Sequence, residues 1–166
     1  FRLRQAAGQG TTFAIYLPAA AQGRPDQDGQ RPRPDLPLGG DETILLVDDE
    51  QDILATASEA LRGAGYRVLT AHTGEEALEK YTGAGEAVGL VVMDLSMPGM
   101  GGQRCLSRLL QHDTKAKVLV ATGYADQALG EAIMAAGALG IIKKPYHFSE
   151  LLAVVREALD RQPPLS

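Results

Sequence analysis

Three carboxylates, one hydroxyl and one ammonium group occur in this sequence at positions where they could act together. Asp48 and Asp49 form an acidic pair, and Asp94, Thr122 and Lys144 follow at wide intervals. Three carboxylates at close range repel one another and cannot all remain ionised at low energy without a cation. A hard divalent ion with oxygen ligands removes this conflict, and Mg²⁺ or Mn²⁺ is the expected ion. One carboxylate could then take up a phosphoryl group as an acyl phosphate, while the ammonium neutralises the oxygens of that group.

Taken one at a time, these residues have more ordinary explanations. An Asp-Asp pair most often begins a helix, a Thr can simply end a strand, and a Lys before Pro is usually solvated. The tripeptide Met97-Pro98-Gly99 is by itself a turn. The combination is informative because the residues follow four separate apolar runs, in an order that would bring them all to one edge of a sheet.

From Thr43 onward, short apolar runs rich in Val, Ile and Leu alternate with longer segments of helical periodicity. The predicted strands are 43–47, 67–71, 90–93, 117–121 and 140–142. The predicted helices are 52–64, 74–81, 103–111, 126–136 and 149–161. Thr73 or Gly74 can cap the second helix, and Gly65 and Gly137 stand where a left-handed residue ends a helix. Five strand–helix units in a row predict an α/β fold, an open parallel sheet with helices on both faces and a ligand site beyond the carboxyl ends of its strands.

The residues at these strand ends resemble the receiver domain of two-component response regulators. The positions that carry the resemblance are Asp48-Asp49, Asp94 with Met97-Pro98-Gly99, Thr122-Gly123 and Lys144-Pro145. The resemblance covers roughly residues 42–160. It implies a flavodoxin-like, doubly wound sheet of five parallel strands in the order 2-1-3-4-5, and a domain that accepts a phosphoryl group from a phosphohistidine with the help of Mg²⁺.

The resemblance also implies a role for each matching residue. Asp94 would be both the phosphoacceptor and a metal ligand, Asp49 a direct metal ligand, and Asp48 a metal ligand that often acts through water. Ser96 would offer its backbone carbonyl to the metal. Thr122 and Lys144 would grip the phosphoryl oxygens. Lys143 competes with Lys144 for this role, but the family's Lys directly precedes Pro, which selects Lys144; the Lys-Pro bond is often cis in the family.

Three further positions bear on the lifetime of the phosphoryl group and on the response to it. Gly123 would leave room for the phosphoryl group, and Tyr124 would flank the path of the attacking water. Ile141 departs from the family, which usually has Tyr or Phe three residues before the functional Lys. We therefore expect no ring rotation at position 141 on phosphorylation.

The segments before residue 41 differ in character from the rest of the chain. Residues 1–17 alternate and turn like a β-hairpin, and residues 8–18 resemble the last hairpin of a histidine-kinase ATP-binding domain. Residues 18–40 hold five of the nine prolines and predict a linker. We therefore divide the chain into hairpin (1–17), linker (18–40), receiver (41–162) and tail (163–166). Together with the start at Phe1, this predicts a fragment from the C-terminal part of a hybrid sensor histidine kinase.

The composition limits which partners the chain can bind and where in the cell it is expected. Residues 1–40 carry a net charge of +2 and the remainder −7, so an acidic domain argues against direct binding to nucleic acid. No apolar run approaches the ~20 residues that span a bilayer, so we expect no membrane contact by this fragment, although the parent kinase can be anchored. One cysteine, Cys105, excludes an internal disulfide and agrees with a cytoplasmic location. The expected partners are the phosphohistidine of the parent or a cognate kinase, or a histidine phosphotransfer protein.

Two alternatives to the phospho-receiver stay open at this point. A haloacid-dehalogenase-like phosphatase also uses a strand-end Asp, Mg²⁺, Thr and Lys, but it needs a second Asp two residues after the nucleophile, where this chain has Ser96. A phosphorylation-independent interaction domain would have lost a pocket residue, and none is missing here. As an enzyme, the fragment would only take up and hydrolyse its own phosphoryl group, whereas the parent would be an ATP-dependent kinase.

Overall fold

The computed structural model describes residues 2–5, 11–14, 39–84, 88–123 and 127–161. They belong to two units, Phe1–Leu36 and Pro37–Ser166, and each unit is described by itself. Most of the predicted linker, the predicted tail and Tyr124 lie outside the described residues.

The first unit contains one antiparallel pair of strands. β1 (Arg2–Gln5) pairs with β2 (Thr11–Ala14), with Arg2 opposite Ala14 and Gln5 opposite Thr11. The alternation in residues 1–17 predicts such a pair. Its resemblance to part of a kinase ATP-binding domain stays a prediction.

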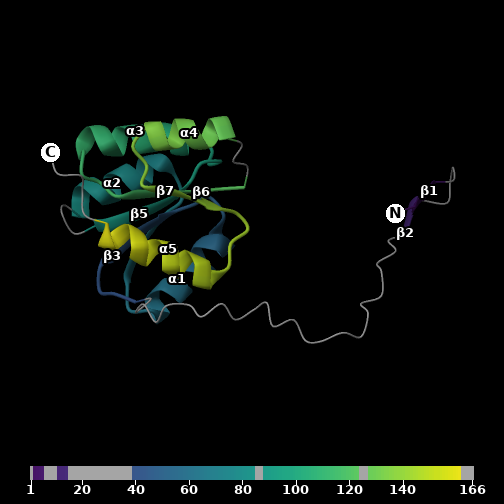
Figure 1. Ribbon diagram of the computed structural model, residues 1–166, viewed down its shortest axis with the longest axis horizontal. Coiled ribbons are helices and arrows are strands. Elements are labelled where there is room, and N and C mark those ends of the chain that lie inside the picture. The colour runs from purple at the N-terminus through teal and green to yellow at the C-terminus, as the bar shows by residue number, and fades with distance from the viewer. Residues whose placement is uncertain (1, 6–10, 15–38, 85–87, 124–126, 162–166) are drawn as a thin grey trace. The chain divides into compact units, whose positions relative to one another are not determined.

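The second unit is built on five parallel strands (Figure 1). The strands are β3 (Thr43–Val47), β4 (Arg67–Ala71), β5 (Val88–Asp94), β6 (Val118–Thr122) and β7 (Gly140–Lys143). Their order in the sheet is β4-β3-β5-β6-β7, which is the 2-1-3-4-5 order of the flavodoxin-like prediction and confirms it. β5 begins two residues earlier than predicted, and Gly89, within the added part, lies close to Glu42 and Leu159.

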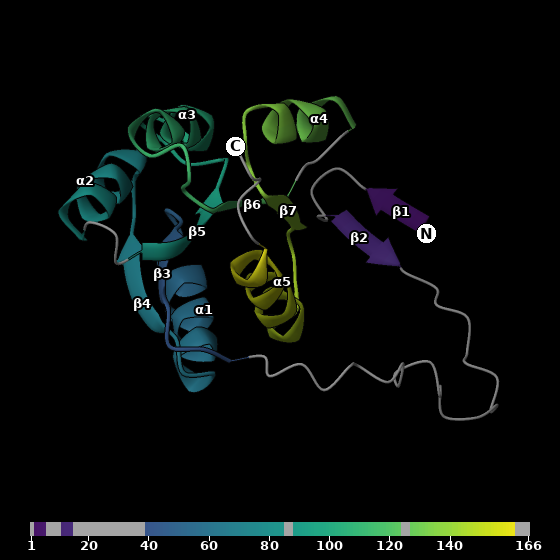
Figure 2. The same cartoon turned by 60° about the vertical axis from the view of Figure 1, so that its left-hand side comes forward.

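Five helices cover the two faces of this sheet. They are α1 (Gln51–Gly63), α2 (Gly74–Ala84), α3 (Gly102–His112), α4 (Gln127–Ala135) and α5 (Phe148–Asp160). α1 and α5 lie on one face, and α2, α3 and α4 on the other (Figure 2). Side chains alternate along β3 accordingly: Ile44 and Leu46 pack toward α1 and α5, and Leu45 and Val47 toward the other layer. All four are almost fully buried, as expected for a sheet covered on both sides.

The helix ends follow the signals in the sequence. The Thr73 hydroxyl accepts a hydrogen bond from the backbone N–H of Glu76 at 3.1 Å, which caps α2. Gly65 and Gly137 have φ angles of 99° and 101°, the left-handed conformation predicted for them after α1 and α4. Among the helices of the described segments, none has the length and apolar content needed to cross a bilayer.

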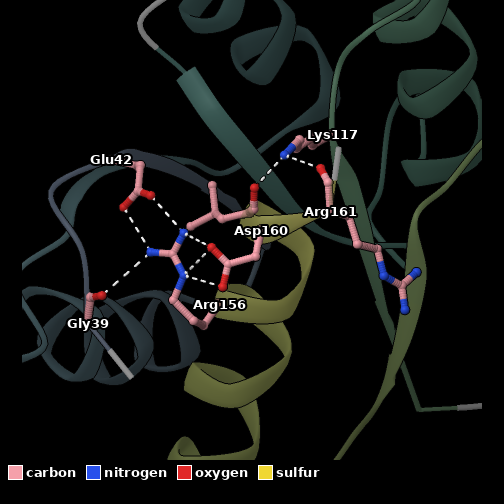
Figure 3. A network of polar contacts seen from close by, with 7 residues as sticks. Gly39, Glu42, Lys117, Arg156, Asp160 and Arg161 are labelled. Atoms are coloured by element: carbon pink, nitrogen blue, oxygen red, sulfur yellow. Dashed lines mark hydrogen bonds and ion pairs between the residues drawn. The ribbon is translucent and has the colours of Figure 1, made fainter. Parts of the chain in front are cut away.

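A network of charges at the end of α5 ties this helix to the start of β3 (Figure 3). The guanidinium of Arg156 forms two hydrogen bonds with the carboxylate of Glu42, at 2.9 and 3.2 Å, and also contacts Asp160 and the carbonyl of Gly39. Nearby, the Lys117 ammonium donates to the carbonyls of Leu159 and Arg161. This network lies at the amino ends of the strands, and the predicted site lies at their carboxyl ends.

Candidate phosphoacceptor site

The predicted site residues follow the carboxyl ends of four strands. Asp48 and Asp49 come directly after β3, Asp94 ends β5, Thr122 ends β6 and Lys144 follows β7. Parallel strands bring these ends to one edge of the sheet. The three carboxylates each offer an oxygen atom, and these oxygens lie within 4.8 Å of one another. The prediction that these three carboxylates come together at the ends of their strands is therefore confirmed.

The three carboxylates differ in how far they are buried. Asp48 and Asp94 are only 4% and 5% exposed, whereas Asp49 is exposed. One oxygen of Asp48 accepts a hydrogen bond from the backbone N–H of Glu50 at 2.9 Å, and its other oxygen contacts Lys144. Asp48 is thus held by neighbouring groups, and Asp49 lies at the rim.

Lys144 joins two of the carboxylates. Its Nζ lies 2.6 Å from Oδ2 of Asp48 and 3.4 Å from Oδ1 of Asp94. Burial lowers the pKa of this ammonium, but the hydrogen bond and charge of Asp48, with a smaller effect of Asp94, outweigh burial and leave the pKa above its usual value. The ammonium therefore stays charged throughout the neutral range.

Lys144 and the neighbouring Lys143 occupy different positions at the end of β7, and it is the ammonium of Lys144 that contacts the acidic cluster. Lys143 is the last residue of β7, pairs with Thr122 in the sheet and is exposed. The N–H of Lys144 donates to the carbonyl of Thr122 at 2.8 Å, which ties the two strand ends together. The Lys144–Pro145 peptide bond is cis.

The loop after Asp94 closes tightly on the end of β5. Ser96 is an exposed residue of this loop, and the side chain of Met97 is buried in the core. The N–H of Gly102, at the start of α3, donates to the carbonyl of Leu95 at 3.2 Å. A Cβ atom added to Gly102 would lie 2.3 Å from the carbonyl oxygen of Asp94, so only glycine fits where α3 meets β5.

The remaining predicted positions lie around this cluster. Thr122 is buried, and a Cβ atom added to Gly123 would meet nothing within 4 Å, so there is open space beside it. Ile141 lies within β7 and packs against the core on the α2–α4 side. Tyr124, for which a position beside the phosphoryl group is predicted, lies outside the described residues.

An open hollow of about 450 Å³ adjoins the cluster. Lys144 and Gly123 line it on the side of the cluster, and Ile53, Tyr146 and Phe148 provide apolar surface. Sequence reasoning missed Tyr146, which also lines a small cavity beside Asp48 and Asp94, and whose pKa is raised by burial. The sequence could have indicated that Tyr146 lies near the site, because Tyr146 directly follows Lys144-Pro145.

The donor set fits a hard divalent cation. Carboxylate oxygens are the ligands that Mg²⁺ and Mn²⁺ take in proteins, and here three of them converge with an exposed member at the rim. An ion with two positive charges, together with the ammonium of Lys144, would balance three negative charges. The composition and geometry of the cluster therefore agree with the expected metal site.

Comparison with known proteins assigns the family. The chain belongs to the response regulator receiver domain family, which it matches over residues 44–156. It is therefore a phospho-receiver of two-component signal transduction, a class of domain that accepts a phosphoryl group on an aspartate and binds Mg²⁺ through an acidic cluster. Nothing in these comparisons supports the phosphatase or the phosphorylation-independent domain.

Two relatives illustrate the range of proteins that contain such a domain. The chain is 32% identical to the chemotaxis protein CheY of Treponema pallidum (strain Nichols), and the match covers 74% of this chain and 86% of that protein. It is 33% identical to the sensor kinase CckA of Brucella abortus (strain 2308) over 161 residues, which are 93% of this chain but 17% of the kinase. This chain thus spans about a sixth of that kinase.

Solved structures agree with the fold. A CheY-like receiver domain protein from Methanospirillum hungatei JF-1 has 32% sequence identity and a TM-score of 0.67, and the match covers 73% of this chain and 95% of that one. A chain of the CheX–CheY–BeF₃–Mg²⁺ complex from Borrelia burgdorferi has 27% identity and a TM-score of 0.70, and the match covers 72% of this chain and 90% of that one.

Proposed function

We propose that Asp94 is the phosphoacceptor of this receiver and that Asp48, Asp49, Asp94 itself and the carbonyl of Ser96 hold Mg²⁺. The observation that carries this proposal is the position of the Lys144 ammonium between Asp48 and Asp94, at the edge where the three carboxylates converge. A carboxylate with a fixed positive charge beside it is a suitable nucleophile for phosphoryl transfer.

The reaction follows from these positions. A carboxylate oxygen of Asp94 attacks the phosphorus of a phosphohistidine, the new O–P bond forms as the P–N bond breaks, and the imidazole nitrogen keeps the electron pair of the broken bond. Lys144, 3.4 Å from Asp94, lies within reach of the transferred oxygens, and Thr122 ends the neighbouring strand. Mg²⁺, when bound, supplies positive charge that offsets the negative charge of the phosphoryl group. The open space beside Gly123 accommodates that group.

The larger context is also part of the proposal. The similarity to the sensor kinase CckA extends over 161 residues, well beyond the receiver, and residues 8–18 resemble a hairpin of a kinase ATP-binding domain. We infer that the phosphoryl group comes from the phosphohistidine of the parent or a cognate kinase, or passes to a histidine phosphotransfer protein in a phosphorelay. The domain divisions at residues 17, 40 and 162, and a cytoplasmic location, belong to this same proposal. With Ile141 in place of a ring, the response proceeds without ring rotation at that position.

The test is chemical phosphorylation of the purified chain. Acetyl phosphate or phosphoramidate with Mg²⁺ should add one phosphoryl group, seen by intact mass, and EDTA should prevent the addition. Asp94→Asn should abolish it because an amide is a poor nucleophile, whereas Asp52→Asn, at an exposed position in α1, should label like the wild type. Equal labelling of Asp94→Asn and the wild type would overturn the assignment.

A further inference from the structure

We propose that Glu75 is a positioning residue for the loop that follows the acceptor, and that through this loop it supports metal binding. The inference rests on the proposed function, in which Ser96 of this loop offers its carbonyl to Mg²⁺. Glu75 is 19 residues before Asp94 in the chain and lies in the first turn of α2, where an acidic residue is favourable for the helix itself.

Glu75 reaches across from α2 to the tip of the loop. Its Oε1 accepts a hydrogen bond from the backbone N–H of Met100 at 3.1 Å. The same carboxylate borders Gly99, where an added Cβ atom would lie 3.5 Å from Oε2. Gly99 and Gly101 have φ angles of 76° and 73°, so Met100 stands between two residues in a conformation that glycine adopts readily. A loop with this much backbone freedom needs fixed contacts to hold one shape.

The other contacts of the loop hold its base and its middle, and Glu75 holds its tip. At the base, the N–H of Gly102 donates to Leu95, and in the middle the side chain of Met97 is buried. Ser96 lies between these two points. Within the described part of the chain, the hydrogen bond from the N–H of Met100 to Glu75 connects the tip of the loop to a different element, α2.

The helix that carries Glu75 is itself held against the loop. The thiol of Cys105, in the first turn of α3, donates to the carbonyl of Gly74 at 3.4 Å. A Cβ atom added to Gly74 would lie 3.1 Å from that of Cys105, so the two helices approach closely at this point. The backbone of Glu75 is therefore fixed relative to the start of α3, where the loop ends. An exposed carboxylate on such a support acts as a fixed acceptor for the N–H of Met100.

The experiment separates the hydrogen bond from the charge. Glu75→Ala removes both, and Glu75→Gln removes the charge but keeps an oxygen acceptor. Glu79→Ala is the matched control, because Glu79 is an exposed acidic residue of the same helix. For each full-length variant, we would measure hydrogen exchange of the Met100 amide without metal, the Kd for Mg²⁺ and the melting temperature.

The expected result is specific to the hydrogen bond. Glu75→Ala should exchange the Met100 amide several-fold faster and bind Mg²⁺ several-fold more weakly, with a melting temperature close to that of Glu79→Ala. Glu75→Gln should behave like the wild type in both measurements. Unchanged Mg²⁺ affinity in Glu75→Ala, or equal weakening in Glu75→Gln and Glu75→Ala, would overturn the inference.

The failure of this inference can be told apart from failure of the proposed function. If the wild type binds Mg²⁺ and Asp94→Asn alone loses labelling, while Glu75→Ala keeps its affinity, only the role of Glu75 is wrong. If the wild type does not bind Mg²⁺ at all, the proposed metal site and the role of Glu75 in it are both wrong.

Discussion

At the scale of single residues, the backbone of the proposed acceptor Asp94 depends on the absence of a side chain at Gly102. A Cβ atom on Gly102 would lie 2.3 Å from the carbonyl oxygen of Asp94 and 2.7 Å from the Cα of Leu95. Both are backbone atoms next to a buried strand, and they cannot move aside as a flexible side chain would. We predict that Gly102→Ala destabilises the fold by ~1–3 kcal/mol, as other overpacked positions do, and lowers labelling of Asp94.

The control for this prediction is Gly83→Ala near the end of α2, where an added Cβ atom would meet nothing within 4 Å. That change should leave stability unchanged or raise it by up to ~1 kcal/mol, because alanine favours the helix. Urea unfolding gives both values. A Gly102→Ala variant as stable as Gly83→Ala would contradict the close contact between α3 and Asp94.

Tyr124 gives the second prediction at this scale. It stands two residues after Thr122, a position that in the family flanks the path of water toward the phosphoryl group. A ring there would exclude the in-line water that hydrolysis needs. We predict that Tyr124→Ala shortens the lifetime of the acyl phosphate several-fold at saturating Mg²⁺, and that Tyr124→Phe, which keeps the ring, decays like the wild type. An unchanged or slower decay in Tyr124→Ala would reject shielding and leave Tyr124 as a candidate for partner contact.

The sequence predicted that Asp48, Asp49 and Asp94 converge, but not which of them Lys144 contacts most closely. Charged residues at strand ends could be assigned because the order of parallel strands fixes where those ends meet. Which carboxylate Lys144 approaches more closely depends on how side chains pack, and the sequence did not indicate that it would be Asp48 at 2.6 Å. The contact between Glu75 and Met100 was missed for the same reason, because it arises from the packing of α2 against α3.

At the scale of elements, the periodicity predicted all five strands and all five helices of the receiver. The predicted ranges differ from the observed ones in where the elements begin and end. The last helix begins at Phe148, one residue before the predicted Ser149, and α1 begins at Gln51 rather than Asp52. Such shifts are expected, because the residues next to a helix end are set by capping contacts as well as by apolar spacing. The first turn of α5 follows Lys144 closely, so one helix connects the acidic cluster to the network around Arg156.

That network makes the stability of the fold depend on pH. The hydrogen bond from Arg156 lowers the pKa of Glu42 below its ordinary value of 4.5. A carboxyl group with a lowered pKa stabilises the fold above its unfolded pKa, and the stabilisation is lost as the pH falls through the folded pKa. We predict that the melting temperature of Glu42→Gln falls less than that of the wild type between pH 6 and about pH 3. Parallel acid curves for the two proteins would contradict the role of Glu42.

Arg156 should contribute more to the free energy of unfolding than Arg161, an exposed arginine at the same end of α5. Its side chain is 13% exposed and serves Glu42, Asp160 and the carbonyl of Gly39, whereas that of Arg161 is 52% exposed. Arg156→Met should lower the free energy of unfolding at pH 7 by about 1–3 kcal/mol, since it leaves charged partners unpaired. Arg161→Met, the matched control, should change it by about 1 kcal/mol or less. Equal effects in the two variants would mean that the network contributes no more than a surface ion pair.

At the scale of the whole molecule, the question is what the segment before the receiver contributes. A two-stranded hairpin is marginally stable alone, because it has little apolar surface to bury. The last residues of the predicted linker behave differently: the N–H of Gly40 donates to the carbonyl of Ala64 at 3.3 Å, and Arg156 contacts Gly39. The receiver as a stable unit therefore includes these two glycines, two residues before the proposed boundary at residue 41.

We predict that the melting temperature falls stepwise as the chain is shortened from its N-terminus. A chain of residues 39–166 should melt within a few degrees of the full chain, because it keeps the contacts of Gly39 and Gly40 and loses the hairpin and most of the linker. A chain of residues 41–166 should melt somewhat lower, because Ala64 loses its N–H donor and Arg156 loses a carbonyl. All three chains should label equally at Asp94, which lies at the opposite edge of the sheet, and none should hydrolyse ATP. Calorimetry and intact mass test these points. A large drop in melting temperature between the full chain and residues 39–166 would mean that the hairpin or linker stabilises the receiver, and the division of the chain proposed here would then be wrong.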